Sequence, residues 1–313
     1  MMRRSYLNAP ILACLLMASP AWAFEELSVE TLTVEARVHR LASAIEFGFG
    51  SLWMMTVCNV SLVRVEAINN EITEVRIFGI DTPLSMAIGE AAVWVSDAKN
   101  RAIFKIDPND YSVMKEIPVP MLSTEGSIGV GEGAVWVTTA DEFDNTLTRF
   151  NARSGVAEAK ISLPSSGSSV VVGDGSVWVT GYARNELYRI DPKTNTIMSI
   201  TELNQTPRYL AVGEGSIWVF NQGDSSVQRI DAKTGKLIAA IKTGLPLGSG
   251  NITGGGGYVW VSMQGVPVTQ IDPKTNMVIR RFIGGHGIGG HIRYGAGSLW
   301  IAGGRISRLR TPN

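Results

Sequence analysis

The side chains that could bind a metal ion or move a proton are few, and they gather in two short stretches of the sequence. All three histidines, His39, His286 and His291, lie there, with Glu46 and Arg293 close by. Histidine serves as a metal ligand, as a general base or as an ordinary hydrogen-bonding residue. The set therefore predicts either a metal or acid–base centre or a plain polar rim, depending on the fold that positions it.

A tryptophan repeat indicates that fold. Each tryptophan lies between apolar, mostly β-branched residues, and a Gly-x-Gly turn precedes six of the seven. A period of about 40 to 45 residues with several short strands is typical of a propeller blade. We predict an all-β, seven-bladed β-propeller with four-stranded antiparallel blades. The repeated residues, 40 to 42 positions apart, are Trp53, Trp94, Trp136, Trp178, Trp218, Trp260 and Trp300.

Turn residues divide each repeat into four strands, called a to d from the axis outward. A glycine five residues before the tryptophan ends strand a, and a second glycine usually follows two residues later. We expect both glycines to provide the positive φ of a tight hairpin turn. Strand b carries the tryptophan, which we expect to pack between neighbouring blades. Strand c ends at motifs such as Ile190-Asp191-Pro192, where the aspartate caps its own turn.

The last repeat has no strand d, because the chain ends at Asn313 soon after strand c. Residues Thr31–Val38 alternate in the way expected of an outer strand. We therefore predict that Thr31–Val38 completes blade 7 and closes the ring. Closure leaves only short outer edges exposed.

In this fold strand a lines a central channel, and the candidate residues occupy alternating positions along it. Seven positions before the tryptophan lie Glu46 in blade 1 and Arg293 in blade 7, and most other blades have small or aliphatic residues there. The larger polar groups thus fall on blades 5, 6, 7 and 1. The residues nine positions before the tryptophans are Ala44, Ser85, Ser127, Ser169, Tyr209, Asn251 and His291.

We predict a site at the mouth of this channel, at the end where the connections between strands vary. His291 would carry a proton or bind a metal, Glu46 would be its acidic partner, and Arg293 would face an anion. Tyr209, Asn251, His39 and His286 would bind the ligand. In the alternative, Glu46 and Arg293 form an ion pair that fastens the ring, and His291 only binds water.

The N-terminal sequence predicts where the protein is located. Residues 1–23 contain Arg3 and Arg4, a short apolar run and the sequence Ala21-Trp22-Ala23, which predicts a signal peptide and a single propeller domain at residues 24–313. We expect a periplasmic or secreted protein, or an anchored one if Cys14 is acylated. No later segment reaches the roughly 20 apolar residues of a membrane helix. Only Cys58 would remain after cleavage, so no intrachain disulfide can form.

Charge excludes one class of partner. The 28 basic residues of the chain become 26 after removal of Arg3 and Arg4, against 28 acidic residues, for a net charge of 26 − 28 = −2. Nucleic-acid binding usually needs a clearly basic face, so we expect none. The expected partner is a protein or a small molecule, bound by a monomer.

The repeat resembles the YVTN-type and streptogramin (virginiamycin B) lyase-like propellers. The similarity lies in sequences such as Ile-x-Val-Gly-Glu-Gly-Ser-Ile-Trp-Val followed by Ile-Asp-x-Lys-Thr-Gly, and it covers residues 29–310. Those lyases carry Pro-His-Gly-Ile at the start of strand a in late blades and an acidic residue past strand b. Here Gly290-His291-Ile292-Arg293 has its histidine one place later, and Gln264 and Gly304 replace the acid.

The residues and the resemblance together leave two candidate functions. The first is an exported propeller that binds a partner protein or small ligand without a cofactor. The second, which the resemblance implies, is a metal-assisted lyase or hydrolase with a divalent ion such as magnesium at the channel mouth.

Overall fold

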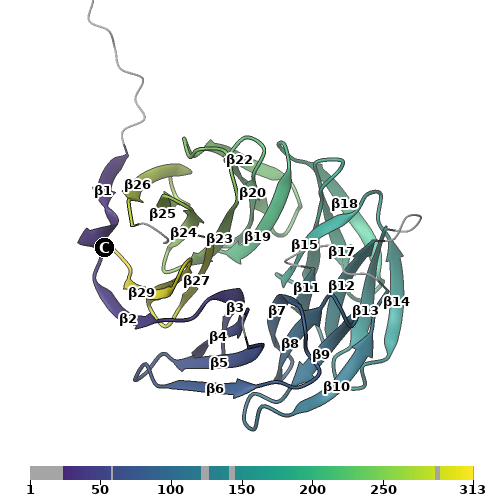
Figure 1. The fold of residues 1–313 in the computed structure, drawn as a ribbon. Helices are drawn as coiled ribbons and strands as arrows, with labels where there is room; N and C mark the ends of the chain where they lie inside the picture. The colour runs from purple at the N-terminus through teal and green to yellow at the C-terminus, as the bar shows by residue number, and fades with distance from the viewer. Residues whose placement is uncertain (1–23, 58, 121–126, 141–144, 286–289, 313) are drawn as a thin grey trace, which may run out of the picture.

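The computed structural model describes residues 24–57, 59–120, 127–140, 145–285 and 290–312, and it is a seven-bladed β-propeller (Figure 1). The signal peptide predicted for residues 1–23 lies outside the described residues. Among these residues, no helix is long and apolar enough to cross a membrane.

Blades 1 to 4 follow each other around the axis, and each is a four-stranded antiparallel meander. From the axis outward their strands are β3 (Ala42–Gly48), β4 (Ser51–Thr56), β5 (Ser61–Glu66) and β6 (Ile72–Arg76); β7 (Pro83–Gly89), β8 (Ala92–Asp97), β9 (Ala102–Ile106) and β10 (Val113–Pro118); β11 (Ile128–Gly131), β12 (Ala134–Ala140), β13 (Asn145–Asn151) and β14 (Ala157–Ser162); and β15 (Gly167–Gly173), β16 (Ser176–Gly181), β17 (Glu186–Asp191) and β18 (Thr196–Glu202).

Blades 5 to 7 complete the ring, and both ends of the chain meet in blade 7. Their strands are β19 (Pro207–Gly213), β20 (Ser216–Asn221), β21 (Ser226–Asp231) and β22 (Leu237–Lys242); β23 (Gly250–Gly255), β24 (Tyr258–Met263), β25 (Val266–Asp272) and β26 (Met277–Ile283); and β27 (His291–Gly295), β28 (Ser298–Ala302), β29 (Ile306–Arg310) and β2 (Val34–Val38).

The tryptophans form the core between blades, as predicted. All seven have no exposed surface. In every blade the indole Nε1 donates a hydrogen bond of 2.9 to 3.3 Å to the carbonyl of the glycine five residues earlier. The buried N–H needs a partner, because an unpaired polar group would be costly inside the core. The constant spacing between glycine and tryptophan in the sequence is therefore the spacing of this bond.

The structure corrects the role predicted for the first glycine of each turn. In five blades this residue does not have a positive φ; Gly173 is one example. A Cβ atom at Gly173 would lie 2.7 Å from the side chain of Val212 in the next blade. The first glycine therefore allows two blades to approach closely. The second glycine, such as Gly175 with a φ of 68°, does supply the positive φ of the turn.

The ring closes through the N-terminal segment, as predicted. Strand β2 pairs antiparallel with β29, with Val34 opposite Leu309 and Val38 opposite Ile306. The strand begins at Val34, since residues Val29–Thr31 form a short 3-10 helix, η1.

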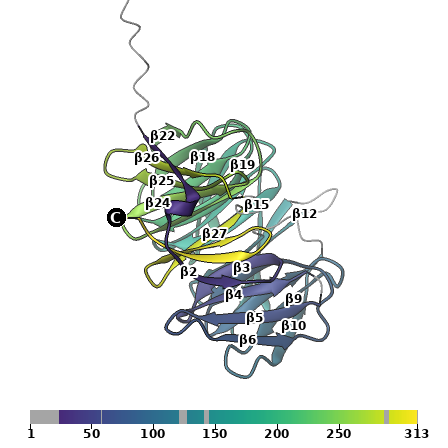
Figure 2. The same ribbon diagram turned by 60° about the vertical axis from the view of Figure 1, so that its left-hand side comes forward.

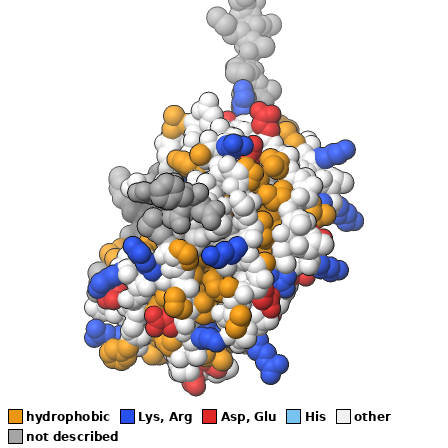
Figure 3. Space-filling model, turned by 90° about the vertical axis from the view of Figure 1, so that its right-hand side faces the viewer, with side chains coloured by type: hydrophobic (Ala, Val, Ile, Leu, Met, Phe, Trp, Pro, Cys, Tyr) orange, Lys and Arg blue, Asp and Glu red, His pale blue; other side chains and the backbone are white. Residues whose placement is uncertain are grey.

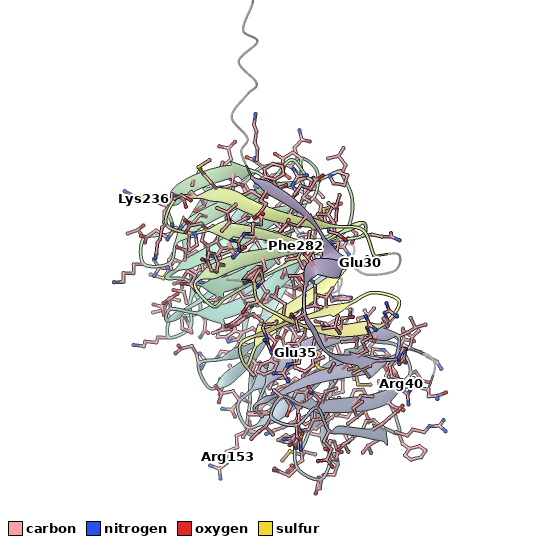
Figure 4. All side chains as sticks on the ribbon, turned by 90° about the vertical axis from the view of Figure 1, so that its left-hand side faces the viewer. Glu30, Glu35, Arg40, Arg153, Lys236 and Phe282 are labelled. Atoms are coloured by element: carbon pink, nitrogen blue, oxygen red, sulfur yellow. The ribbon has the colours of Figure 1, made fainter. Side chains whose placement is uncertain are left out.

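An additional strand was not predicted. Strand β1 (Glu25–Ser28) pairs in parallel with β26, so blade 6 has five strands rather than four. Glu25 forms a 3.2 Å ion pair with Arg280. Val29 and Leu32 pack in one cluster with Trp260 and Phe282. Figure 4 shows the segment crossing from Phe282 in blade 6 towards Glu35 in blade 7, and Figure 2 shows β2 leading from it into β3.

Candidate functional site

A cavity of about 280 Å³ lies on the propeller axis. Strand a of every blade contributes to its wall, through residues such as Ala44 in blade 1 and Leu84 in blade 2. Because strand a is innermost in each sheet, alternate side chains of seven strands converge on this space. The cavity collects five of the seven predicted site residues: Glu46, Tyr209, Asn251, His291 and Arg293.

Arg293 is the centre of the polar wall. Its Nε donates to Glu46 Oε2 at 2.9 Å, and its Nη1 donates to Asn251 Oδ1 at 3.0 Å and to its own strand at Ile292 O, at 2.7 Å. The network joins β27 of blade 7 to β3 of blade 1 and to β23 of blade 6. The ion pair predicted as a fastening of the ring is therefore present, and it includes a third blade.

Both partners of Arg293 are held in place by backbone groups. Glu46 Oε1 accepts a hydrogen bond from Phe47 N at 3.1 Å, and Asn251 Oδ1 accepts one from Ile252 N at 2.8 Å. Asn251 is also almost fully buried, with 4% of its surface exposed. These bonds fix the orientation of both side chains before any ligand arrives, which lowers the entropic cost of binding.

Two hydrogen-bond donors remain available at this wall. Asn251 Oδ1 is occupied, so its Nδ2 is the group left to donate, and Arg293 has Nη2 left beyond Nε and Nη1. Within the described part of the chain, no protein acceptor bonds either nitrogen. The two nitrogens belong to side chains that are bonded to each other, Arg293 through Nη1 and Asn251 through Oδ1.

The opposite wall, from blades 2 to 4, is mainly aliphatic. Ile88, Val130 and Val172 lie there, with Ser85 and Ser169 as small polar exceptions. The cavity therefore has one polar side and one apolar side. That pattern suits an amphipathic molecule held by a few directed hydrogen bonds.

Of the two histidines that the structure describes, only His291 lines the cavity. His291 is half-buried at the cavity wall, at the first position of β27. His39 is exposed in the connection between β2 and β3, outside the cavity lining, and its carbonyl accepts a hydrogen bond from the adjacent Arg40. Figure 4 labels Arg40 at the rim of the molecule. His286 lies outside the described residues. Tyr209 is buried at the cavity wall, and the Arg208 guanidinium lies 5.5 Å from the centre of its ring.

The donor set does not fit a divalent metal. Across the residues that the structure describes, no three His, Cys, Asp or Glu side chains come together. Divalent ions in proteins need several oxygen or nitrogen ligands. The single carboxylate of the wall, Glu46, is already bonded to Arg293 and Phe47. We therefore derive no step that uses a metal.

Comparison with known proteins shows a similar fold. A catalytically inactive virginiamycin B lyase of Staphylococcus aureus, with a histidine replaced by alanine and quinupristin present, has a TM-score of 0.72 and 18% identity, over 90% of this chain and 98% of that one. A streptogramin B lyase structure has a TM-score of 0.70 and 18% identity, over 93% and 99%. The propeller domain of Cps50 (Swd1) from Myceliophteria thermophila has a TM-score of 0.70 and 13% identity, over 90% and 100%.

These likenesses show the fold alone. The resemblance inferred from the repeat is confirmed at that level. No family model matches the sequence, and no curated protein matches it. The similar structures include lyases and the Cps50 (Swd1) propeller domain, and one fold can serve many functions, so the fold does not select a function.

The bond between Asn251 and Arg293 was missed by sequence reasoning, although both residues were singled out. Asn251 lies nine positions before its tryptophan and Arg293 seven before its own, so they occupy different rows of the channel in a simple alignment of repeats. The long Arg293 side chain spans the two rows, with its Nη1 3.0 Å from Asn251 Oδ1.

Proposed function

We propose that this protein is an exported binding propeller that holds a small, uncharged molecule in its central cavity through a carbonyl-type oxygen. The arrangement of Arg293 between Glu46 and Asn251 carries the proposal. Asn251 Nδ2 and Arg293 Nη2 would donate to the ligand oxygen, and the aliphatic wall opposite would contact its apolar part.

Charge balance favours an uncharged ligand. Glu46 already neutralises Arg293 across a 2.9 Å bond, so a carboxylate ligand would bring an unpaired negative charge into a half-buried space. Such a charge is costly without a partner. A neutral carbonyl would receive the same hydrogen bonds at no net charge. The volume of about 280 Å³ is just below the usual range for drug-sized ligands, which is about 300 to 1,000 Å³.

The first prediction concerns Asn251→Asp. The new carboxylate keeps an oxygen for Arg293 and Ile252 but replaces the free donor with an acceptor. The ligand carbonyl would then face a carboxylate oxygen without this donor, and an unsatisfied buried polar group costs about 1 to 3 kcal/mol, so affinity for a neutral amide should fall by roughly five- to a hundredfold. Calorimetry with a panel of small amides and lactams, and the carboxylic acids of matching size, measures this.

Ser169→Ala on the opposite wall is the matched control and should keep most of the affinity. The proposal fails if the carboxylates bind more tightly than the amides, or if Asn251→Asp binds the amides as wild type does.

A lyase or hydrolase is the second candidate. His291 at the cavity wall and the similar fold of known lyases favour it. Those same ligands, followed for bond cleavage with and without added magnesium, separate the two functions. Cleavage that His291→Ala abolishes, while binding remains, would establish the enzyme; binding without turnover supports the binding propeller.

Export is part of the proposal, supported by Arg3-Arg4, the short apolar run and Ala21-Trp22-Ala23. The second prediction is that mass spectrometry of the protein purified from its native host finds Phe24 as the first residue. An uncleaved cytoplasmic chain would contradict export, and an acylated Cys14 would show a membrane-anchored protein instead.

A further inference from the structure

The outer edges of most blades carry features that hinder pairing with another strand. The pairing between strands c and d contains a register shift in blades 2, 3, 4, 5, 6 and 7. Lys115, Lys160 and Lys242 lie on β10, β14 and β22. Strand β1 covers the edge of blade 6. Bulges, lysines and covering strands are the usual means by which proteins block edge-to-edge association. Figure 3 shows the side of the ring that carries β14, where Lys and Arg side chains lie among hydrophobic ones.

Blade 1 lacks all of these features. Its outer strand β6 pairs with β5 from Val65 opposite Ile72 to Ser61 opposite Arg76 without a register shift. It contains no lysine or proline, and it has a hydrogen-bonded neighbour on one side only (Figure 1). Of the outer strands in the seven blades, all of them described, β6 alone combines a regular backbone with an uncovered edge.

The backbone pattern shows which residues point outward. Ile77 N bonds to Val60 O, and Glu66 N bonds to Glu71 O, so odd-numbered residues of this strand direct their backbone groups towards β5. In an antiparallel pair the alternate residues direct theirs to the other side. The outward N–H and C=O groups of β6 therefore belong to Ile72, Glu74 and Arg76, and Phe78 follows in the turn after the strand. A large, apolar, exposed side chain lies at each end: Ile72 at 49% and Phe78 at 78%.

We propose that β6 pairs with β6 of a second copy of this chain, antiparallel about a two-fold axis through Val75. In this register Glu74 of each copy faces Arg76 of the other, and Ile72 of each faces Phe78 of the other. Every outward residue meets a suitable partner, since cross-strand apolar pairs and opposite charges stabilise a sheet. The two blades become one continuous eight-stranded sheet.

The charges of Glu74 and Arg76 favour this register, and they also favour a second copy of the chain as the partner. Shifting the pairing by two residues in one direction places Glu74 opposite itself, and in the other places Arg76 opposite itself. Like charges directly opposite each other destabilise a sheet. A pattern that matches itself under a two-fold rotation is the requirement for a closed homodimer. The intramolecular pair between Arg40 and Glu74 does not compete strongly, because both side chains are partly exposed and surface ion pairs contribute little.

A further apolar residue extends the contact. Ile68 precedes β6 and is 90% exposed. In the antiparallel arrangement the Ile68 end of one copy lies next to the Phe78 end of the other. Ile68 and Phe78 add buried area beyond the strand itself, which a specific interface needs.

The experiment is sedimentation of the purified chain over a wide concentration range. Wild type should show a species of twice the mass of the purified chain, which is 33.7 kDa before removal of the signal peptide. Arg76→Glu and Glu74→Arg each turn two attractive contacts into two repulsive ones, and each should weaken the dimer at least about tenfold. The double variant Glu74→Arg/Arg76→Glu restores opposite charges and should recover the dimer. Mixing the two single variants should produce a heterodimer that neither forms alone.

Lys160→Glu on β14 is the matched control. Glu158 and Lys160 have the same spacing and opposite charges as Glu74 and Arg76, but the register shift interrupts that edge. The control should sediment as wild type does. A wild-type protein that stays monomeric at every concentration overturns the proposal. So does a dimer that both charge variants form as readily as wild type, which would place the contact elsewhere.

Discussion

At the residue scale, the tryptophans of six of the seven blades each have a cationic side chain over the ring. The charged group of a strand c residue lies 5.0 to 5.4 Å from the ring centre, in Arg64, Lys105, Arg149, Arg189, Arg229 and Arg308. Several of these side chains also bond to the turn between strands c and d of the next blade. Arg229 Nη1 donates to Pro273 O and, at 3.0 Å, to Asn276 Oδ1. Each such residue thus links its own tryptophan to the neighbouring blade.

Blade 6 has Gln270 at this position. Its side chain is completely buried, and neither amide atom has a hydrogen-bond partner among the residues that the structure describes. The physical reason lies in the next blade. Strands c and d of blade 7 come from opposite ends of the chain, so no turn connects them and no turn carbonyl is there to accept.

The third prediction concerns Arg229 and Gln270, whose replacement by methionine should affect the free energy of unfolding differently. Arg229→Met keeps the length of the side chain but removes the cation–π contact and the bonds to blade 6, so it should lower the free energy of unfolding by about 1.5 to 3 kcal/mol. Gln270→Met removes a buried amide that lacks partners, so stability should stay level or rise. Urea unfolding of both variants measures the difference. Equal losses in both would show that Gln270 is satisfied in solution.

At the element scale, the joint between β2 and β29 depends on one carboxylate. Glu35 accepts from Ser298 Oγ at 2.6 Å and lies 3.1 Å from the nearest guanidinium nitrogens of Arg308 and Arg310. The hydrogen bond from Ser298, with the charges of the two arginines, lowers the pKa of Glu35 below its usual value of 4.5 despite partial burial. Since the folded state favours the ionised form, Glu35 stabilises the closed ring above pH 4.5, and this contribution is lost as pH falls through the lowered pKa.

The fourth prediction follows from this sign. Glu35→Gln should be less stable than wild type at pH 7, because the charged hydrogen bonds are lost. The gap should narrow as the pH is lowered below 4.5, because wild-type Glu35 is protonated as the pH falls through its lowered pKa. Chemical unfolding of both proteins, from pH 7 to the lowest pH at which both stay folded, provides the measurement. The absence of any gap at pH 7 would mean that Glu35 does not stabilise the joint.

At the scale of the whole molecule, the sequence predicted what repeats and missed what occurs once. The tryptophan spacing predicted seven blades, and the absent last strand d predicted closure by Thr31–Val38, of which Val34–Val38 forms the strand. Strand β1 was missed because Glu25–Ser28 is short and without apolar alternation, and its parallel partner β26 lies about 255 residues away. The sequence reasoning explained the first glycine of each turn by a positive φ. In the structure, the close approach of the next blade is what requires glycine there.

For the candidate site too, the sequence predicted one part and missed another. Position along strand a was enough to predict that Glu46 and Arg293 meet, because the two residues occupy one row of adjacent blades. The placement of His39 depends on an irregular connection, for which a repeat holds no rule, and the structure puts it outside the cavity wall. Its role in ligand binding stays a prediction, as does that of His286.

The closure between β2 and β29 also sets an order in time. Val34 and Leu309, which face each other in blade 7, are separated by 309 − 34 = 275 positions. Until residues 306–310 are available, the ring stays open and β2 lacks its partner β29. Pairings between distant segments are slow to form. The joint that closes the ring is therefore expected to form late in folding.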